Sequence, residues 1–305
     1  MQNKIYNGAD SLPLGNAKKK LTEGCLVLEG GAFRGVYTNG VIDALLEGGV
    51  KMQTVVGVSA GALNGMCYAA GNIGIAGRVN LLYRHDPRYV GRTAFRTDHG
   101  IMGYSFMFGQ ILKDLKFDRE TFMDPSHKFY AAYTNCLTGK MEYMEKSDPA
   151  IEAAVRASAS MPLVSRMVDV KGTPCLDGGC SYKIPLNFAL ERDFERIVVV
   201  CTRPKGYRRK EDDRSLTLQQ RLYRKYPKFG QAIADSSRKY NETCQKIDEL
   251  EKEGRLFLIA PSRDLHIKRM EGDMEKLGEL YYLGYNDTKQ RLSDLKAYLS
   301  KRDPF

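Results

Sequence analysis

The sequence predicts an α/β fold with a mostly parallel sheet, and the first part of the chain carries the pattern. A short apolar run at Cys25–Leu28 is followed by a glycine turn and by a segment, Val36–Leu46, that suits a helix. The same order recurs, with a strand pattern at Met52–Val58 and a helix rich in small residues at Ala60–Ala70. Strands that alternate with helices in this way pair in parallel and carry the helices on their faces.

The strand pattern continues along the chain. A hairpin is expected at the Lys171-Gly172 turn, because strand-like segments flank it on both sides. The order of the strands in the sheet cannot be predicted from these segments. The further strands are expected at Phe129–Thr134, Leu163–Val170, Pro174–Leu176, Ile197–Cys201 and Leu256–Ile259.

Helices dominate the last third of the sequence. One begins after Pro227 and carries apolar side chains at intervals of three, four or their sums, which places them on one helical face. Two shorter helices are expected at Met274–Leu283 and Thr288–Leu299, separated by Gly284. The apolar face of the first helix comprises Phe229, Ile233, Tyr240, Ile247 and Leu250.

Size and composition indicate one main folded core. The chain has 305 residues, and its 43% hydrophobic and 28% charged residues are close to the globular average. These values exclude wholesale disorder, collagen-like repeats and a disulfide-stapled miniprotein. We divide the chain into an N-terminal arm, 1–24, a main α/β domain, 25–201, and a mainly helical, basic C-terminal region, 202–305, that packs on the core or extends it.

Membrane spans, export and metal sites are not expected. No apolar run approaches the ~18 residues that cross a bilayer, and the polar N-terminus lacks the apolar stretch of a signal peptide, so we expect a cytoplasmic location. The seven cysteines and four histidines are scattered along the chain. Because this spacing matches neither a disulfide framework nor a zinc site, we expect reduced thiols and no structural metal.

Positive charge is concentrated in one segment. The chain carries 47 Lys and Arg against 37 Asp and Glu, and residues 203–228 hold ten basic and three acidic residues. Such a patch suits peripheral contact with the anionic inner face of a membrane, and it suits a solvated surface loop equally well. Nucleic acid is not an expected partner, because no nucleic-acid-binding motif accompanies the charge.

The first chemical motif is Gly57-Val58-Ser59-Ala60-Gly61, which lies where an expected strand passes into an expected helix. This G-x-S-x-G spacing suits a tight turn that projects the serine hydroxyl, and side chains at 57 and 61 would clash there. The free N–H groups of the following helix would point at the same place. Ser59 is therefore a candidate nucleophile, and the alternative is a serine that only caps its helix.

A second glycine turn, Glu29-Gly-Gly-Ala-Phe-Arg-Gly35, lies one strand–helix unit upstream. Backbone N–H groups in such a turn can face an anion without intervening side chains, as an oxyanion hole requires. A P-loop is excluded, because Val36-Tyr37 stand where Lys and Ser or Thr are needed. A dinucleotide site is disfavoured, because no Asp or Glu occurs between Glu47 and Asp86 to hold a ribose.

A nucleophilic serine needs a base, and the sequence offers two candidates. His266 would suit an α/β-hydrolase, but that fold places several strands before its nucleophile, and only 58 residues precede Ser59. The remaining candidate is Asp177, in Cys175-Leu-Asp-Gly-Gly-Cys180. A free carboxylate is a weak base, so Asp177 could serve only in a dry pocket that raises its pKa. The alternative is a turn aspartate that binds its own backbone.

Four motifs together resemble those of the patatin-like phospholipase family. They are Gly-Gly-Ala-Phe-Arg-Gly at 30–35, Gly-Val-Ser-Ala-Gly-Ala-Leu-Asn at 57–64, Ala-Ser-Ala-Ser-Met-Pro at 157–162 and Asp-Gly-Gly at 177–179. The resemblance covers residues 25–201. It implies a three-layer α/β/α fold and a serine acyl hydrolase that cleaves lipid or other acyl esters with a Ser–Asp dyad, and the remaining residues would form a helical C-terminal extension.

By matching position, the resemblance assigns Ser59 as the nucleophile, Asp177 as the proton acceptor, and Gly30, Gly31 and Ala32 as the oxyanion hole. It implies an acyl-enzyme and requires no cofactor or metal. One departure is Ala32, where the family usually has a third glycine, so a positive φ there would strain the hole. This departure and the basic C-terminal region support an alternative, a catalytically weak protein that binds lipid or a membrane surface.

Two further features concern the substrate. An acyl chain needs an apolar slot, and Ile101–Ile111 combines methionine, aromatic residues and glycine, which suits an adaptable lining or lid and also suits a buried insert helix. Arg34 is expected either to place its charge near an oxyanion or a phosphate headgroup, or to form a structural ion pair with a carboxylate such as Glu29.

Overall fold

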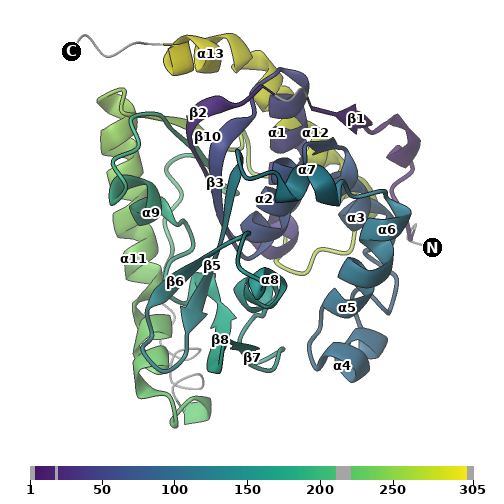
Figure 1. The fold of residues 1–305 in the computed structure, drawn as a ribbon, viewed down its shortest axis with the longest axis vertical. Coiled ribbons are helices and arrows are strands. Elements are labelled where there is room, and N and C mark those ends of the chain that lie inside the picture. Colours follow the sequence, from purple (N-terminus) through teal and green to yellow (C-terminus); the bar gives the residue numbers. More distant parts are fainter. Residues whose placement is uncertain (1–3, 18–19, 211–220, 301–305) are drawn as a thin grey trace.

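The computed structural model describes residues 4–17, 20–210 and 221–300. Within these ranges, the centre of the molecule is an eight-stranded sheet in the order β10-β9-β2-β3-β5-β8-β7, with β6 paired to β5 (Figure 1). Strands β10, β9, β2, β3 and β5 pair in parallel, whereas β6, β7 and β8 pair antiparallel. The strands are β2 Thr22–Leu28, β3 Met52–Val58, β5 Lys128–Asn135, β6 Met141–Glu145, β7 Val168–Val170, β8 Thr173–Asp177, β9 Ile197–Val200 and β10 Leu256–Ile259.

Helices cover both faces of this sheet. The longest is α11, Pro227–Lys252, and Figure 1 shows it beside the sheet on the side opposite α1 and α2. The others are α1 Val36–Glu47, α2 Ala60–Ala70, α3 Ile75–Tyr83, α4 Arg92–Asp98, α5 Tyr104–Phe106, α6 Leu112–Asp114, α7 Arg119–Met123, α8 Ile151–Ala159, α9 Leu186–Leu190, α12 Met274–Gln290 and α13 Leu292–Ser300.

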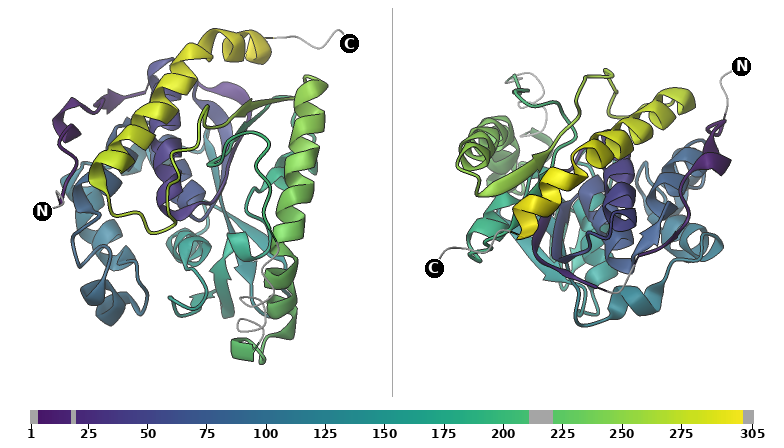
Figure 2. Two further views of the ribbon diagram at one scale, coloured as in Figure 1. Left: turned by 180° about the vertical axis from the view of Figure 1, so that it is seen from behind. Right: turned by 90° about the horizontal axis from the view of Figure 1, so that it is seen from above.

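Alternate side chains of the strands supply two cores. Leu26 and Leu28 of β2 pack in the larger cluster with residues of α1, α2, α8 and α12, whereas Cys25 and Val27 pack in the other cluster with residues of α9 and α11. This is the period of two that a sheet buried on both faces requires. Seen from above in Figure 2, the sheet lies between α11 and the helices of the first half of the chain. The predicted α/β/α fold with a mostly parallel sheet is confirmed.

Two details of the sheet differ from prediction. Strand β6, next to β5, was not predicted, because its five residues, Met-Glu-Tyr-Met-Glu, show neither an apolar run nor a regular alternation of apolar and polar side chains. Of the strand expected at Leu163–Val170, only β7 at its end pairs with β8. The observed bounds of α2, β3 and β10 are those predicted from the sequence.

The predicted helix break at Gly284 is wrong. Helix α12 continues through this glycine, which faces α1. A Cβ at Gly284 would lie 2.1 Å from the carbonyl oxygen of Tyr37, and a Cβ at Gly40 would lie 2.0 Å from that of Tyr281. The two glycines therefore allow α1 and α12 to cross at close range. From the sequence, Gly284 was interpreted as the residue that ends a helix, whereas it is a contact between two helices.

The described parts of the N-terminal arm and of the C-terminal region pack on the main α/β unit. The described part of the arm forms β1, Gly15–Asn16, which pairs with β4, Asn72–Ile73, and strand β2 already begins within the arm at Thr22. The C-terminal region supplies the edge strand β10, helix α11 on one face of the sheet and α12 on the other (Figures 1 and 2). The division of the chain at residues 24 and 201 stays a prediction.

Thiols, metal sites and membrane spans can be stated for the described residues. All seven cysteines are unpaired and buried. In the described ranges, no three or more His, Cys, Asp or Glu side chains cluster so that they could hold a metal ion. No helix in the same part of the chain combines the length and the apolar character needed to cross a bilayer.

Candidate active site

Ser59 and Asp177 lie close together because strands β3 and β8 run in opposite directions along one edge of β5 and end next to each other. Strand β3 pairs with the first half of β5, and its last residue, Val58, lies opposite Ala132. Strand β8 pairs with the end of the same edge of β5, in the opposite direction, and its last residue, Asp177, lies opposite Tyr133. The residue that follows Val58 therefore faces the end of β8. The Ser59 hydroxyl donates a hydrogen bond of 2.8 Å to Asp177 Oδ2.

The turn at Ser59 has the strained geometry that its glycine spacing predicted. Ser59 has φ 57° and ψ −124°, a conformation that residues with a side chain rarely adopt. A Cβ at Gly57 would lie 2.2 Å from the carbonyl oxygen of Gly61, and a Cβ at Gly61 would lie 2.4 Å from that of Leu28. The predicted clashes are thus confirmed. The Ser59 side chain makes no capping hydrogen bond to α2, which argues against the capping alternative.

The motif at 157–162 holds both candidate residues through hydrogen bonds to their backbone. The Ser158 hydroxyl accepts a hydrogen bond of 2.8 Å from the Ser59 N–H and donates one of 2.6 Å to the Ala132 carbonyl. The Ser160 carbonyl accepts one of 2.9 Å from the Asp177 N–H. Sequence reasoning assigned these serines no role, and the only available signal was their place in the motif. They position the turn and the carboxylate relative to each other.

The Asp177 carboxylate is buried and held at both oxygens. While Oδ2 accepts from Ser59, Oδ1 accepts a hydrogen bond of 2.7 Å from the Gly179 N–H. Burial raises the pKa of Asp177 above its ordinary value, and these hydrogen bonds and the charges of Lys183 and Arg269 act in the opposite direction. Asp177 therefore lies in a buried setting that raises its pKa, as a base at this position would require, and its role as the base stays a prediction. His266 lies elsewhere, with a side chain 86% exposed.

Gly30 contributes space to the site. Its N–H donates a hydrogen bond of 2.9 Å to the Lys183 carbonyl and is therefore engaged. A Cβ at Gly30 would lie 2.9 Å from the Ser59 Cβ and as close to the carbonyl oxygen of Val58. The absence of a side chain at position 30 thus allows the glycine turn to approach the serine turn.

The next two residues of this turn present free N–H groups. Among the described residues, the backbone N–H groups of Gly31 and Ala32 have no hydrogen-bond acceptor, nor has that of Ala60 at the start of α2. Ala32 has φ 49°, in the left-handed region that favours glycine. The strain expected at Ala32 is therefore present, and its N–H remains available.

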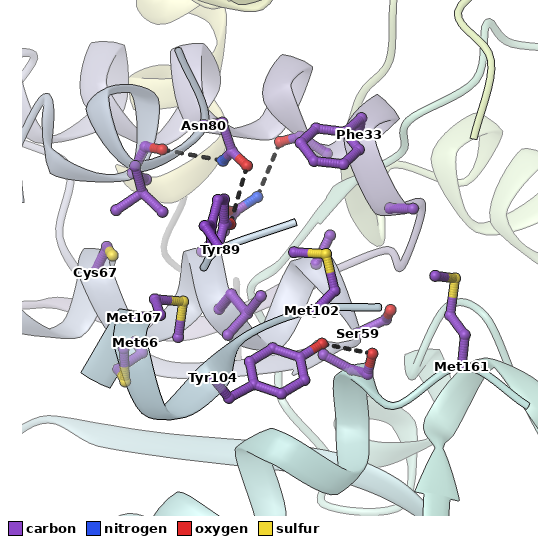
Figure 3. Close-up of a pocket in the computed structure, with 18 of the residues that line it drawn as sticks. Phe33, Ser59, Met66, Cys67, Asn80, Tyr89, Met102, Tyr104, Met107 and Met161 are labelled. Carbon is purple, nitrogen blue, oxygen red and sulfur yellow. Dashed lines mark hydrogen bonds between the residues drawn. The ribbon is translucent and has the colours of Figure 1, made fainter. Parts of the chain in front are cut away.

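A narrow apolar cavity of about 60 Å³ begins at Ser59 (Figure 3). Residues 101–111 contribute to its wall and also pack into the core, where Met107 and Ile111 are buried. Tyr104 anchors this segment, because its hydroxyl donates a hydrogen bond of 2.7 Å to the Ala159 carbonyl. The apolar lining includes Leu63, Met66, Val79, Met102, Tyr104 and Met107.

A second, larger cavity of about 520 Å³ is also lined by Ser59 and, in addition, by Asp177. Arg34 lines it, and within the described ranges no carboxylate lies within 4 Å of its guanidinium, so the expected ion pair with Glu29 does not form. Glu29 instead accepts a hydrogen bond from the Thr202 N–H. The cationic lining of this cavity comprises Arg34, Lys183, Arg209, Lys210 and Arg269.

The basic segment 203–228 lies partly outside the described residues, because 211–220 are not described. In the described part, three of its cations form ion pairs on the surface, whereas Arg209 and Lys210 line the larger cavity. Membrane contact through this segment stays a prediction. The ion pairs are Arg203–Asp264 at 3.6 Å, Lys205–Glu251 at 2.6 Å and Arg208–Asp248 at 2.7 Å.

Comparison with known proteins identifies the family. The family model for patatin-like phospholipases matches residues 26–190, which is more than half of the chain. The chain belongs to the patatin-like phospholipase family. A second family model, for a domain of unknown function (DUF6363), matches residues 226–300 of this patatin-like phospholipase.

Individual relatives match different shares of this patatin-like phospholipase. The uncharacterized protein YjjU of Escherichia coli K12 is 24% identical over 294 residues, which cover 92% of the chain and 80% of the relative. Lysophospholipase nte1 of Aspergillus terreus is 31% identical over 166 residues, but these cover 50% of the chain and only 10% of the fungal protein. The crystal structure of VipD from Legionella pneumophila has a TM-score of 0.43 at 12% identity, over 96% of this chain and 71% of that chain. Family membership supports a lipid hydrolase.

Proposed function

We propose that the protein is a serine acyl hydrolase, of lipase, phospholipase A or lysophospholipase type, that cleaves fatty-acyl esters with Ser59 and Asp177. The observation that carries the proposal is the 2.8 Å hydrogen bond between the two side chains, at a strained turn beside unengaged N–H groups. Membership of the patatin-like phospholipases and the similarity to a lysophospholipase support lipid esters as the substrate class.

In the first step, Ser59 Oγ attacks the ester carbonyl and Asp177 Oδ2 accepts its proton. The N–H groups of Gly31, Ala32 and Ala60 would stabilise the negative charge that develops on the carbonyl oxygen. Collapse of this intermediate breaks the ester bond. The proton passes from Asp177 to the departing alcohol, and the acyl group stays on Ser59.

In the second step, water releases the acyl group. Asp177 accepts a proton from the water as it attacks the acyl-enzyme, and then returns the proton to Ser59 Oγ as the fatty acid leaves. The narrow cavity beside Ser59 would hold the acyl chain, because its lining is apolar. Its volume of about 60 Å³ has room for about four to six water molecules, because one water needs roughly 10–15 Å³. Long chains would therefore require its methionine side chains to move.

Covalent labelling and Ser59→Ala test the nucleophile. A fluorophosphonate probe is expected to label Ser59, located by mass spectrometry of the labelled peptide. Ser59→Ala should lose hydrolysis of p-nitrophenyl butyrate by about 10⁴-fold or more. Ser126→Ala is the matched control, because Ser126 is an exposed loop serine, and it should keep wild-type hydrolysis and labelling.

Asp177→Asn tests the base. The amide can still accept from the Gly179 N–H but is a far weaker proton acceptor, so we expect a loss of hydrolysis of about 10³-fold or more with an unchanged melting curve. Wild-type hydrolysis in a folded Asp177→Asn protein would remove the dyad from the mechanism. Acid should also inactivate the wild type, because Asp177 must be ionised to accept the proton.

A catalytically weak lipid-binding protein is the second candidate, and the positive φ of Ala32 favours it. A strained or displaced hole would bind lipid without turning it over efficiently. Liposome binding without hydrolysis of any acyl ester would support this candidate. Sustained turnover of p-nitrophenyl butyrate that disappears in Ser59→Ala would exclude it.

A further inference from the structure

Two cavities of opposite character meet at the Ser59 hydroxyl. The narrow cavity is apolar, whereas the larger one carries five cationic side chains and a single acidic one, Asp177. An ester carbonyl placed at Ser59 would therefore have its acyl chain on the apolar side and its alcohol part on the cationic side. The larger cavity would then face the headgroup of the substrate.

Among the residues that the structure describes, the cations of the larger cavity form no ion pairs. Within the described ranges, none of the five lies within 4 Å of a carboxylate oxygen. Cations of the adjoining surface behave differently, since Arg203, Lys205 and Arg208 each form an ion pair. In the described part of the chain, the cations of the cavity are therefore unpaired, whereas these three cations of the basic segment are paired.

Two of the guanidinium groups have unsatisfied donors. The Nε atoms of Arg34 and Arg209 are buried and have no hydrogen-bond partner among the described residues. A buried donor without an acceptor costs about 1–3 kcal/mol, and more when it is charged. An anion in the cavity would supply the missing acceptors.

The cations are also close enough to oppose one another. Burial, followed by the charge of Arg209, lowers the pKa of Lys183 to about 8, with Arg269 acting in the same direction and Cys180 and Asp177 against it. Burial lowers the pKa of Arg34 to about 10, and Arg203, Arg269 and Arg209 contribute in the same direction. This mutual repulsion would be relieved by a bound anion.

Arg209 and Arg269 lie outside the part of the chain that matches the patatin-like phospholipase model, and hydrogen bonds of their backbone anchor them beside the site. The Arg209 N–H donates to the Asn241 side chain on α11 and its carbonyl accepts from it, at 2.8 and 3.0 Å. The Arg269 carbonyl accepts a hydrogen bond of 3.2 Å from the Phe33 N–H in the glycine turn. Both cations thus belong to the C-terminal third and are anchored beside the site.

We propose that this cavity binds the phosphate of the substrate headgroup, and that the enzyme prefers acyl esters with a net negative headgroup over neutral and zwitterionic ones. The proposal rests on the proposed function and names the substrate class of the same site. Arg34, Lys183, Arg209 and Arg269 would donate charge-assisted hydrogen bonds to the phosphate oxygens. A choline or ethanolamine headgroup would bring an ammonium group into a cavity that already has excess positive charge.

The test compares soluble substrates with identical acyl chains. The substrates are dihexanoyl-phosphatidate, dihexanoyl-phosphatidylcholine and dihexanoylglycerol, used as monomers so that attraction to a charged interface plays no part. We expect kcat/KM of the wild type to be highest for the phosphatidate. In Arg269→Gln and Arg209→Gln, the ratio of kcat/KM for the phosphatidate to that for dihexanoylglycerol should fall by about 10- to 100-fold. Arg269→Lys should restore part of the ratio.

Lys205→Gln is the matched control, because Lys205 belongs to the same basic segment but pairs with Glu251 and does not line this cavity. It should keep the wild-type ratio. Equal kcat/KM of the wild type for all three substrates would overturn the proposal, as would an unchanged ratio in both arginine variants. Inorganic phosphate should be only a weak competitive inhibitor of phosphatidate hydrolysis. If it inhibits as strongly as the product, hexanoyl-lysophosphatidate, the cavity is a site for free phosphate and the headgroup assignment is overturned.

A binding measurement separates failure of this proposal from failure of the proposed function. Titration calorimetry with Ser59→Ala should show saturable binding of dihexanoyl-phosphatidate that is weakened by adding Arg269→Gln. Binding of this kind in a wild type that hydrolyses no ester would refute the proposed function and leave the anion site intact. Hydrolysis of esters without preferential phosphatidate binding would refute the anion site alone.

Discussion

At the scale of single residues, the sequence predicted the shape of the serine turn but not its surroundings. The turn depends on glycines within two residues of Ser59, so its strained conformation can be predicted from the local sequence. The nearness of Asp177 depends on where β3 and β8 end along β5, a matter of strand register, and only the family resemblance paired the two residues. Arg209 and Arg269 were not identified as site residues, because no local pattern marks two cations among 47.

Ala32→Gly tests the strain in the glycine turn. Ala32 has φ 49°, and glycine adopts this conformation at lower cost, so the variant should be more stable by about 0.5–1 kcal/mol in urea unfolding. If Ala32 also displaces its N–H from the developing oxyanion, kcat for p-nitrophenyl butyrate should rise severalfold. An equal or higher kcat is expected in either case.

Ala297→Gly is the control for this substitution. Ala297 is an exposed residue inside α13, where glycine should cost about 1 kcal/mol of stability. Opposite signs for the two Ala-to-Gly changes would show that backbone conformation at position 32 decides the result. A less stable Ala32→Gly protein would show that the left-handed conformation at this position carries no strain.

At the scale of elements, prediction succeeded where the signal is local and failed where a tertiary partner decides. Helix α2 and strands β3 and β10 follow from unbroken local patterns. A glycine such as Gly284 has two meanings, the end of a helix or a close contact between helices, and only the partner distinguishes them. The short strand β6 pairs with β5 at an edge, and its polar side chains resemble those of a loop.

Gly284→Ala tests the contact between α1 and α12. In an open helix this change adds about 1 kcal/mol of stability, but here the new methyl group would lie 2.1 Å from the Tyr37 carbonyl oxygen. We therefore expect destabilisation of about 2–3 kcal/mol, because two backbones must separate. Gly109→Ala is the control, since a Cβ there would meet nothing within 4 Å, and it should be neutral or stabilising. Equal stability of the two variants would contradict the close crossing.

At the scale of the whole molecule, the C-terminal third completes both the core and the candidate site. Strand β10 extends the sheet beyond β9, α11 covers one face, and α12 packs on α1 over the other. The same region brings Arg209 and Arg269 to the larger cavity. The sequence indicated a basic helical region, but its relation to the site could not be predicted because it depends on long-range packing.

A buried carboxylate joins this region to the first helix. Asp43 of α1 is fully buried, and it accepts a hydrogen bond of 2.6 Å from the Tyr281 hydroxyl on α12 and one of 2.8 Å from the Gly74 N–H. Burial raises the pKa of Asp43 to about 7; Glu47 acts in the same direction, and the two hydrogen bonds and Arg78 act against it. The folded protein therefore holds a proton on Asp43 at pH values where the unfolded chain, with a carboxyl pKa near 4, has lost it.

Asp43→Asn should remove a pH dependence of folding stability. Because the folded state binds this proton more tightly, the contribution of Asp43 is greatest below about pH 4 and is lost as the pH rises to about 7. The free energy of unfolding of the wild type, minus that of Asp43→Asn, should thus fall by about 1.4 kcal/mol per pH unit in urea titrations between pH 5 and 6.5. Tyr281→Phe keeps the carboxyl group but removes a hydrogen bond that lowers the pKa of Asp43. The pKa of Asp43 should therefore rise further, and the stability of this variant should fall with pH up to a higher pH than that of the wild type. Parallel stability curves for the wild type and Asp43→Asn would mean that this carboxylate is ionised in the folded protein throughout the range, and that α12 is joined to α1 by a charged contact.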